Sequence, residues 1–148
     1  MSQVKPVPAG FGTVTPVLNI KGADAAIEFY KKAFGAEEKA RMLGPGGAIM
    51  YAEIRIGDSA IMLGEAVMNP ATQSSTHLFV ADADAAWKRA VDAGATVAMP
   101  LADQFWGDRY GVLVDAWGNR WAIATHKVDM TPDQMQKAGD DFMKTFAK

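Results

Sequence analysis

The chain has few side chains suited to metal binding or nucleophilic catalysis. It contains two histidines, His77 and His126, and no cysteine. Without cysteine there is no thiol nucleophile, zinc ribbon or iron–sulfur cluster. Two histidines allow at most a two-histidine metal site completed by carboxylates such as Glu53. Alternatively, His77 acts as a general base or ligand contact, or is an ordinary strand histidine, and His126 is expected at the surface or an interface.

The remaining polar candidates are grouped by the alternation of a β-strand. Tyr51, Glu53 and Arg55 are spaced two apart and therefore share one face of the expected strand. Glu53 combined with Arg55 or Arg109 has two interpretations. The cluster binds a carboxylate or amide of a ligand, or it is a structural ion pair.

Large aromatic side chains are a second group of candidate contacts. A planar ligand could stack on them, and the alternative is that several belong to the core. The candidates are Phe79, Phe105, Trp106, Tyr110 and Trp117. Phe105 and Trp106 precede Gly107 in an expected loop, where core packing explains two large rings poorly. We therefore expect Phe79, Phe105 and Trp106 among the ligand contacts.

A repeated unit positions these residues. The tetrapeptide beginning at Ala23 recurs at Ala83, 60 positions later, and each copy lies between an apolar run and a helical pattern that ends in Gly-Ala. Asp24 and Asp84 are expected to cap the two helices. Strand-like segments follow each helix, so the unit reads β-α-β-β-β twice. The predicted class is α+β.

Module boundaries follow from turn and cap signals. We expect a first module over residues 13–64, a polar linker over 65–74 and a second module over 75–127. Residues 131–147 should form an amphipathic helix, because Thr131 and Gln134 make a capping box before an apolar stripe. This helix would cover the back of a sheet or a neighbouring subunit.

Composition limits the classes of function. The 148 residues carry a net charge of −2, with 49% hydrophobic and 22% charged residues, the balance of an ordinary globular protein. The weak acidity gives no electrostatic reason to expect a nucleic-acid partner. No apolar run approaches the roughly 20 residues that span a bilayer, and residues 1–12 lack the apolar stretch of a signal peptide. We expect a cytoplasmic protein without membrane contact.

The paired modules and several local motifs resemble the vicinal-oxygen-chelate superfamily, which includes glyoxalase I, extradiol dioxygenases, fosfomycin-resistance enzymes and bleomycin-binding proteins. Its PhnB-like branch is the most similar. The resemblance is carried by Gly22–Tyr30, Ala33–Glu37, Ala52–Ser59, Phe105–Arg109 and Asp115–Trp121. It implies that two βαβββ modules form a glyoxalase/bleomycin-resistance-like half-barrel pair, commonly in a homodimer. The fold alone does not specify a reaction.

The resemblance also implies four metal-ligand positions, one on the first and one on the last strand of each module. In this chain they fall on Thr15, Ser75, Ala122 and either Ile61 or Met62. None of these is a competent ligand for a catalytic divalent cation. A triad of His77, His126 and Glu53 is disfavoured, because the two histidines would lie on the order of 8 Å apart on neighbouring strands.

The resulting hypothesis is a metal-free protein that sequesters a small planar or amphipathic ligand, without cofactor or catalytic residues. The expected contacts are Tyr51, Glu53, Arg55, His77, Phe79, Phe105, Trp106 and Arg109. The alternative is a metal-dependent lyase, isomerase or dioxygenase of the same superfamily. A third possibility is an interaction module in which the C-terminal helix docks on a partner.

Overall fold

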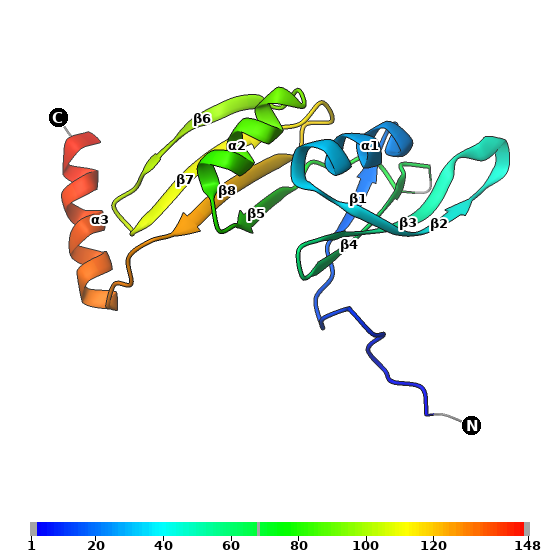
Figure 1. Cartoon of the computed structure of the whole chain (residues 1–148), viewed down its shortest axis with the longest axis horizontal. Coiled ribbons are helices and arrows are strands. Elements are labelled where there is room, and N and C mark those ends of the chain that lie inside the picture. Colours follow the sequence, from blue (N-terminus) through cyan, green and yellow to red (C-terminus); the bar gives the residue numbers. More distant parts are fainter. Residues whose placement is uncertain (1–2, 68, 147–148) are drawn as a thin grey trace. The chain divides into compact units, whose positions relative to one another are not determined.

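The computed structural model describes residues 3–67 and 69–146, and the chain divides into two compact units between Ser74 and Ser75. The first unit contains β1 (Val17–Ile20), α1 (Ala23–Phe34), β2 (Glu37–Leu43), a 3₁₀ turn (Pro45–Gly47), β3 (Ile49–Ile56) and β4 (Ser59–Glu65). The second contains β5 (Ser75–Phe79), α2 (Ala83–Asp92), β6 (Thr96–Asp103), β7 (Asp108–Val114), β8 (Arg120–His126) and α3 (Pro132–Phe146). The α+β class and the double β-α-β-β-β order are confirmed (Figure 1).

Each unit contains its own four-stranded sheet with the same topology. The strand orders are β1-β4-β3-β2 and β5-β8-β7-β6, and the first and last strands of each unit pair in parallel. Val17 pairs with Met62 in the first sheet, and His77 pairs with Ala122 in the second. Both partners shift by 60 positions between the sheets. The repeat seen in the sequence is therefore preserved in the pairing register.

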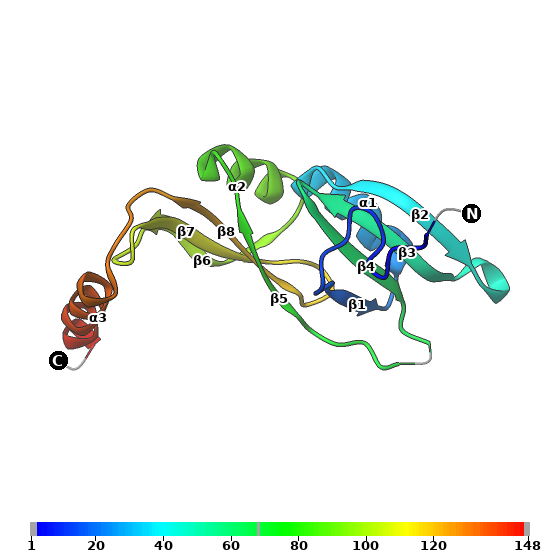
Figure 2. The ribbon, with the colours of Figure 1, turned by 90° about the horizontal axis from the view of Figure 1, so that it is seen from below.

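One face of each sheet packs against the helix of its own unit, as Figure 2 shows for α1 and α2. In the first unit this buried layer includes Ile27 and Tyr30 of α1 and Ile54 of β3, all completely buried. In the second unit it is centred on Trp121 and Ile123, which are also completely buried. Alternation along the strands directs the intervening side chains to the opposite face of each sheet.

The helices begin with caps that differ from the predicted ones. Asp24 and Asp84 do not cap their helices, and both lie one residue inside the first turn. The carboxylate of Glu65 on β4 instead accepts the first two backbone N–H groups at the start of α1, at 2.8 and 2.9 Å. In α2, Asp82 is the N-cap, and the Thr125 hydroxyl accepts the N–H of the first helical residue at 2.9 Å. Both helices are therefore also anchored to the last strand of their sheet.

The C-terminal helix α3 begins at the predicted capping box. Thr131 and Gln134 exchange two hydrogen bonds between side chain and backbone, at 2.9 and 3.1 Å. No described residue of α3 is buried, and Phe146 is 69% exposed. The apolar stripe is therefore largely open to solvent in this chain. No described helix has the length and apolar character needed to cross a membrane.

Candidate functional site: an aromatic face and a paired arginine

Aromatic rings line the face of the second sheet that α2 leaves uncovered. A side chain at Gly111 would run into Trp87 of α2, so Gly111 faces the helix and its neighbour Tyr110 faces away. The ring of Tyr110 stacks on His77 at 5.6 Å between centroids, and His77 lies 4.5 Å from Phe79. These rings flank Ala122 and Ala124 of β8, which are buried.

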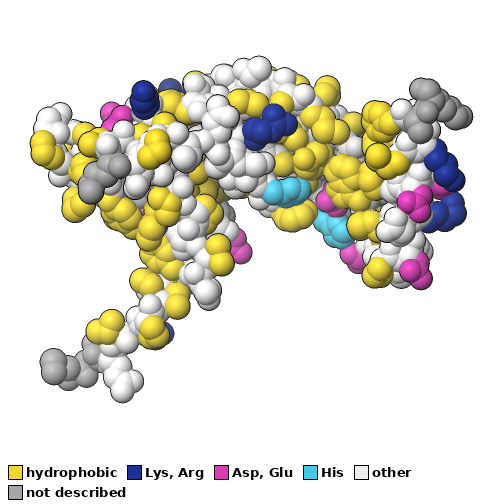
Figure 3. Space-filling view, turned by 180° about the vertical axis from the view of Figure 1, so that it is seen from behind, with side chains coloured by type: hydrophobic (Ala, Val, Ile, Leu, Met, Phe, Trp, Pro, Cys, Tyr) yellow, Lys and Arg dark blue, Asp and Glu magenta, His cyan; other side chains and the backbone are white. Residues whose placement is uncertain are grey.

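The aromatic run continues from the sheet to α3. Trp106 lies edge-on to Tyr110 at 5.1 Å and to Phe105 at 5.0 Å. Phe105 in turn packs on Phe142 of α3 at 4.8 Å, and Phe142 lies 4.9 Å from Phe146. We call Phe79, His77, Tyr110, Trp106 and Phe105 the aromatic face. Figure 3 shows both imidazole groups of the chain bordering hydrophobic side chains.

A buried carboxylate fixes the orientation of one of these rings. Asp108 is 7% exposed and accepts a hydrogen bond from the indole nitrogen of Trp106 at 3.1 Å. Its other oxygen lies 2.7 Å from Nδ1 of His126, whose Nε2 lies 2.6 Å from Asp129. The Asp129 and Asp108 carboxylates raise the pKa of His126 and favour the imidazolium, which donates to both. His126 is therefore a bridging group rather than a free base.

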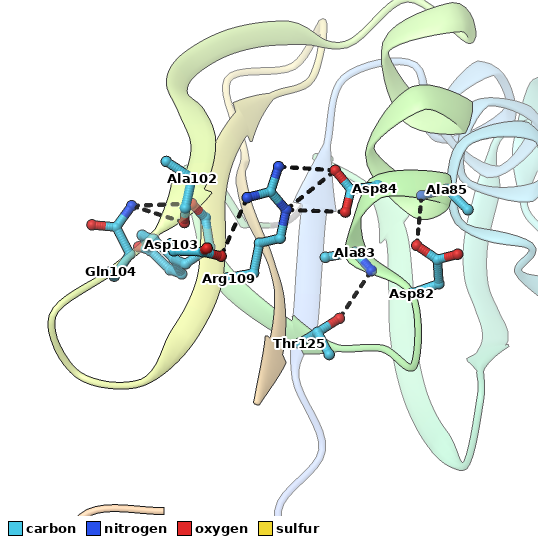
Figure 4. A network of polar contacts seen from close by, with 10 residues as sticks. Asp82, Ala83, Asp84, Ala85, Ala102, Asp103, Gln104, Arg109 and Thr125 are labelled. Carbon is cyan, nitrogen blue, oxygen red and sulfur yellow. Dashed lines mark hydrogen bonds and ion pairs between the residues drawn. The ribbon is translucent and has the colours of Figure 1, made fainter. Parts of the chain in front are cut away.

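Arg109 belongs to a separate network, drawn in Figure 4. Its guanidinium donates to both oxygens of Asp84 at 3.0 to 3.2 Å, and to Asp103 at 3.2 Å. Bonding to these carboxylates raises the pKa of Arg109 and lowers that of Asp84. The pair links β7 to the first turn of α2. Asp84 thus stabilises this junction instead of capping the helix, and Arg109 does not extend the aromatic face.

In the first unit, Glu53 and Arg55 form an ion pair with 3.2 Å between Oε1 and Nη2. Their side chains are 10% and 20% exposed. Nη1 of Arg55 also donates to the backbone carbonyl of Gly10 at 2.7 Å, and the guanidinium lies over the Phe11 ring at 5.0 Å. Of the two expected partners of Glu53, the structure therefore shows Arg55.

Tyr51 lies beside this pair and lines a cavity of about 210 Å³ in the first unit. The cavity walls come from β1, β3, β4 and the loop after β4, and they include Val17, Asn19, Met62 and Asn69. Both carboxylate oxygens of Glu65, at the cavity wall, are held by the start of α1. The cavity thus offers two amides, a phenol and apolar groups.

The register locates the last-strand position implied by the resemblance. Met62 occupies in the first sheet the place that Ala122 occupies in the second, so the choice between Ile61 and Met62 falls on Met62. Methionine and alanine supply no hard ligand for a catalytic divalent cation. Within residues 3–67 and 69–146, no cluster of three or more His, Asp or Glu side chains is arranged to hold a metal ion.

The structure assembles some of the predicted contacts and adds others. His77, Phe79, Phe105 and Trp106 join one aromatic face, while Tyr51, Glu53 and Arg55 share one face of β3. Tyr110, one of the aromatic candidates in the sequence that the expected contacts left out, completes the aromatic run between His77 and Trp106. Gly10 and Phe11 lie too far from Arg55 in the sequence for any local pattern to have indicated their contact.

Comparison with known proteins places this geometry in context. The family model "Glyoxalase/Bleomycin resistance protein/Dioxygenase superfamily" matches residues 11–123. An uncharacterized protein of Mycobacterium bovis is 39% identical over 137 residues, covering 84% of this chain and 90% of that protein.

Solved structures agree on the fold. TioX of Micromonospora sp. ML1 has a TM-score of 0.67 at 24% identity, covering 81% of this chain and 100% of that one. TnmS3 of Streptomyces sp. CB03234, described as an antibiotic binding protein, has a TM-score of 0.63 at 20% identity, covering 78% and 98%. The repeated β-α-β-β-β units, their shared register and the match over residues 11–123 lead to one assignment: the chain belongs to the glyoxalase/bleomycin resistance protein/dioxygenase superfamily.

Proposed function

We propose that this protein binds and sequesters a small planar or amphipathic molecule without a metal ion or a chemical step. The observation that carries the proposal is the aromatic face, in which five rings from β5, β7 and the loop before β7 lie 4.5 to 5.6 Å from their neighbours. Phe79, at one end of it, is 67% exposed. Rings that contact one another and remain partly open to solvent provide aromatic surface on which a planar ligand stacks.

The side chains at the four inherited ligand positions support binding over metal-dependent catalysis. Thr15, Ser75, Met62 and Ala122 offer no imidazole or carboxylate. The two histidines serve other contacts, since His77 lies between aromatic rings and His126 bridges two carboxylates. TnmS3 shows that this fold hosts antibiotic binding, and we propose a related role here.

We further propose that the chain belongs to the PhnB-like branch and acts as a homodimer in the cytoplasm. The branch assignment rests on the motifs Gly22–Tyr30 and Asp115–Trp121. Dimerisation would also cover apolar side chains that one chain leaves exposed, among them Phe142 and Phe146 of α3.

Fluorescence titration with 9-aminoacridine, a planar probe, tests the binding proposal. Tyr110→Leu removes the central ring of the aromatic face, and loss of one aromatic contact of about 1 kcal/mol should weaken binding roughly five-fold. Phe79→Ala should weaken it by a similar factor with little effect on folding, because Phe79 is mostly exposed. Val91→Ala, on α2 and outside the aromatic face, is the matched control.

Measurement of bound metal tests the metal-free part of the proposal. The protein is dialysed separately against Ni, Mn, Fe and Zn, and bound metal is measured by elemental analysis. A stoichiometric, tightly bound metal that is lost in His77→Ala or Glu53→Ala would refute the metal-free proposal and favour the lyase, isomerase or dioxygenase alternative. Equal binding of 9-aminoacridine by wild type, Tyr110→Leu and Phe79→Ala would refute the aromatic face as the binding surface.

A further inference from the structure

The N-terminal segment places two groups of its own on Arg55, as a small ligand would. The Gly10 carbonyl accepts from Nη1 at 2.7 Å, and the Phe11 ring lies 5.0 Å from the guanidinium carbon. A carbonyl oxygen and an aromatic ring thus occupy one arginine at the same time. In Figure 1 this segment, in dark blue, leads into β1, and its contact with Arg55 bridges 45 residues of sequence.

We propose that residues 8–11 are a displaceable internal substitute for the ligand, and that Arg55 is the subsite for an aromatic ring bearing a neutral carbonyl oxygen. This inference rests on the proposed function, because it assumes that the protein binds a small molecule. It adds a binding site within the first unit, the chemical class of the group bound there, and a competitor for it within the chain.

The charge balance at Arg55 determines that class. Glu53 already pairs with Nη2 at 3.2 Å, and both side chains are mostly buried. A ligand carboxylate would place a second anion beside one cation in a poorly solvated site, which is unfavourable. A neutral carbonyl preserves the pair, and the Gly10 oxygen is such a group. An aromatic ketone or amide therefore fits better than an aromatic acid.

Arg55 also retains bonding capacity. Its Nε is buried and has no hydrogen-bond partner among the described residues. A buried donor without an acceptor is unfavourable, because it has lost its bonds to water and gained none in the protein. The Gly10 carbonyl bonds only to Nη1, so the segment satisfies Arg55 incompletely. Nε–H lies on the same edge of the guanidinium as Nη2, beside Glu53. A ligand with a second acceptor on that edge would gain this bond, which gives it an advantage over residues 8–11.

The segment is held by few interactions. Residues 3–10 are exposed and belong to no helix or strand, and a single backbone bond, from Phe11 to Pro8 at 3.1 Å, closes the turn. Gly10 has φ +82°, and a Cβ there would collide with the Arg55 guanidinium. Because alanine is strained at this positive φ, Gly10→Ala is expected to open the turn and release the Gly10 carbonyl from Arg55.

Calorimetric titration of the full chain with 2-naphthamide and 2-naphthoate tests the proposal, because the probes share a ring and differ in charge. Gly10→Ala should bind 2-naphthamide about five- to ten-fold more tightly than wild type, with a smaller gain for 2-naphthoate. Gly12→Ala is the matched control, since a Cβ there makes only an ordinary van der Waals contact, 3.9 Å from the Val14 carbonyl oxygen, and Gly12 has no positive φ. Arg55→Lys combined with Gly10→Ala should abolish the gain, because lysine lacks the planar set of donors.

Three results would overturn the inference: no gain in Gly10→Ala, an equal gain in Gly12→Ala, or a gain that survives Arg55→Lys. Tighter binding of 2-naphthoate than of 2-naphthamide would overturn the assigned class. Circular dichroism and urea unfolding of each variant verify that it is folded. If Tyr110→Leu weakens binding of 9-aminoacridine but Gly10→Ala does not tighten binding of 2-naphthamide, only the inference about Arg55 is refuted and the aromatic-face proposal stands. Unchanged binding in Tyr110→Leu would refute the aromatic-face proposal.

Discussion

Substitution of Asp115 is expected to lower the stability of the second unit more than its place in a turn suggests. The carboxylate is 6% exposed and accepts three hydrogen bonds. Oδ1 accepts from the backbone nitrogens of Trp117 and Asn119 at 2.9 and 3.0 Å, and Oδ2 accepts from the indole nitrogen of Trp121 at 2.9 Å. One side chain thus closes the turn between β7 and β8 and orients the largest core residue.

The structure gives the size of the effect. In Asp115→Asn, the amide oxygen keeps the two backbone donors, and the amide nitrogen then faces the indole N–H of Trp121. A hydrogen bond to a charged group contributes about 1.5–3 kcal/mol, so its loss beside an opposed donor should destabilise by about 2–3 kcal/mol. Asp115→Ala leaves all three donors without this acceptor, two of them buried, and should destabilise by about 3–6 kcal/mol. A single domain has about 5–15 kcal/mol in total.

Urea unfolding followed by tryptophan fluorescence and by circular dichroism measures these differences. A double-mutant cycle with Trp121→Phe isolates the indole bond, because phenylalanine retains a ring and lacks the N–H. In the Trp121→Phe background, Asp115→Asn should be less destabilising by about 1.5 kcal/mol or more. A change below about 0.5 kcal/mol for Asp115→Asn, or an equal change in both backgrounds, would refute the assigned role of the carboxylate.

Three further substitutions test other parts of the second unit. Because the pKa of His126 is raised in the folded state, its bridge to the two carboxylates stabilises the fold fully below the unfolded pKa of about 6.5. This stabilisation is lost as pH rises through the higher folded pKa. Thermal melts from acid to alkaline pH should show the loss in wild type and not in His126→Gln. Gly107→Ala should lower the free energy of unfolding, measured by urea titration, by more than about 1 kcal/mol, because φ is +97° and a Cβ would collide with the Val128 carbonyl. Gly94→Ala is the control: its φ is also positive, but a Cβ there meets open space, so its effect should be smaller. Thr131→Ala should remove about 1 kcal/mol from the start of α3, seen as faster amide exchange in its first turn, and unchanged exchange would contradict the capping assignment.

Local patterns in the sequence predicted much of the architecture. Alternation grouped Tyr51, Glu53 and Arg55 on one face of β3, and the structure keeps them there. The capping box at Thr131 and Gln134 formed as expected, since its two bonds involve residues three apart. These features depend on neighbours within one element, where residue spacing alone determines the geometry.

Features that depend on distant partners were not predictable in this way. The cap of α1 comes from Glu65, more than 40 residues along the chain, so the nearby Asp24 was a wrong choice. Asp84 was also assigned as a cap, and it pairs instead with Arg109 from another strand. Phe142 belongs to the apolar stripe of α3, and the sequence does not indicate which residue it packs against; in the structure its ring packs on Phe105. Each case needs the tertiary arrangement before the side chain can be assigned.

The parallel pairing of the first and last strands has a consequence for the order of folding during synthesis. β1 leaves the ribosome first in its unit, yet its hydrogen-bonding partner β4 begins about 40 residues later, and β5 waits in the same way for β8. Antiparallel hairpins between neighbouring strands close shorter loops and should form earlier. Each unit therefore completes its sheet only after β4 or β8 has left the ribosome. Until then the backbone of β1 or β5 lacks its parallel partner and can pair with other chains.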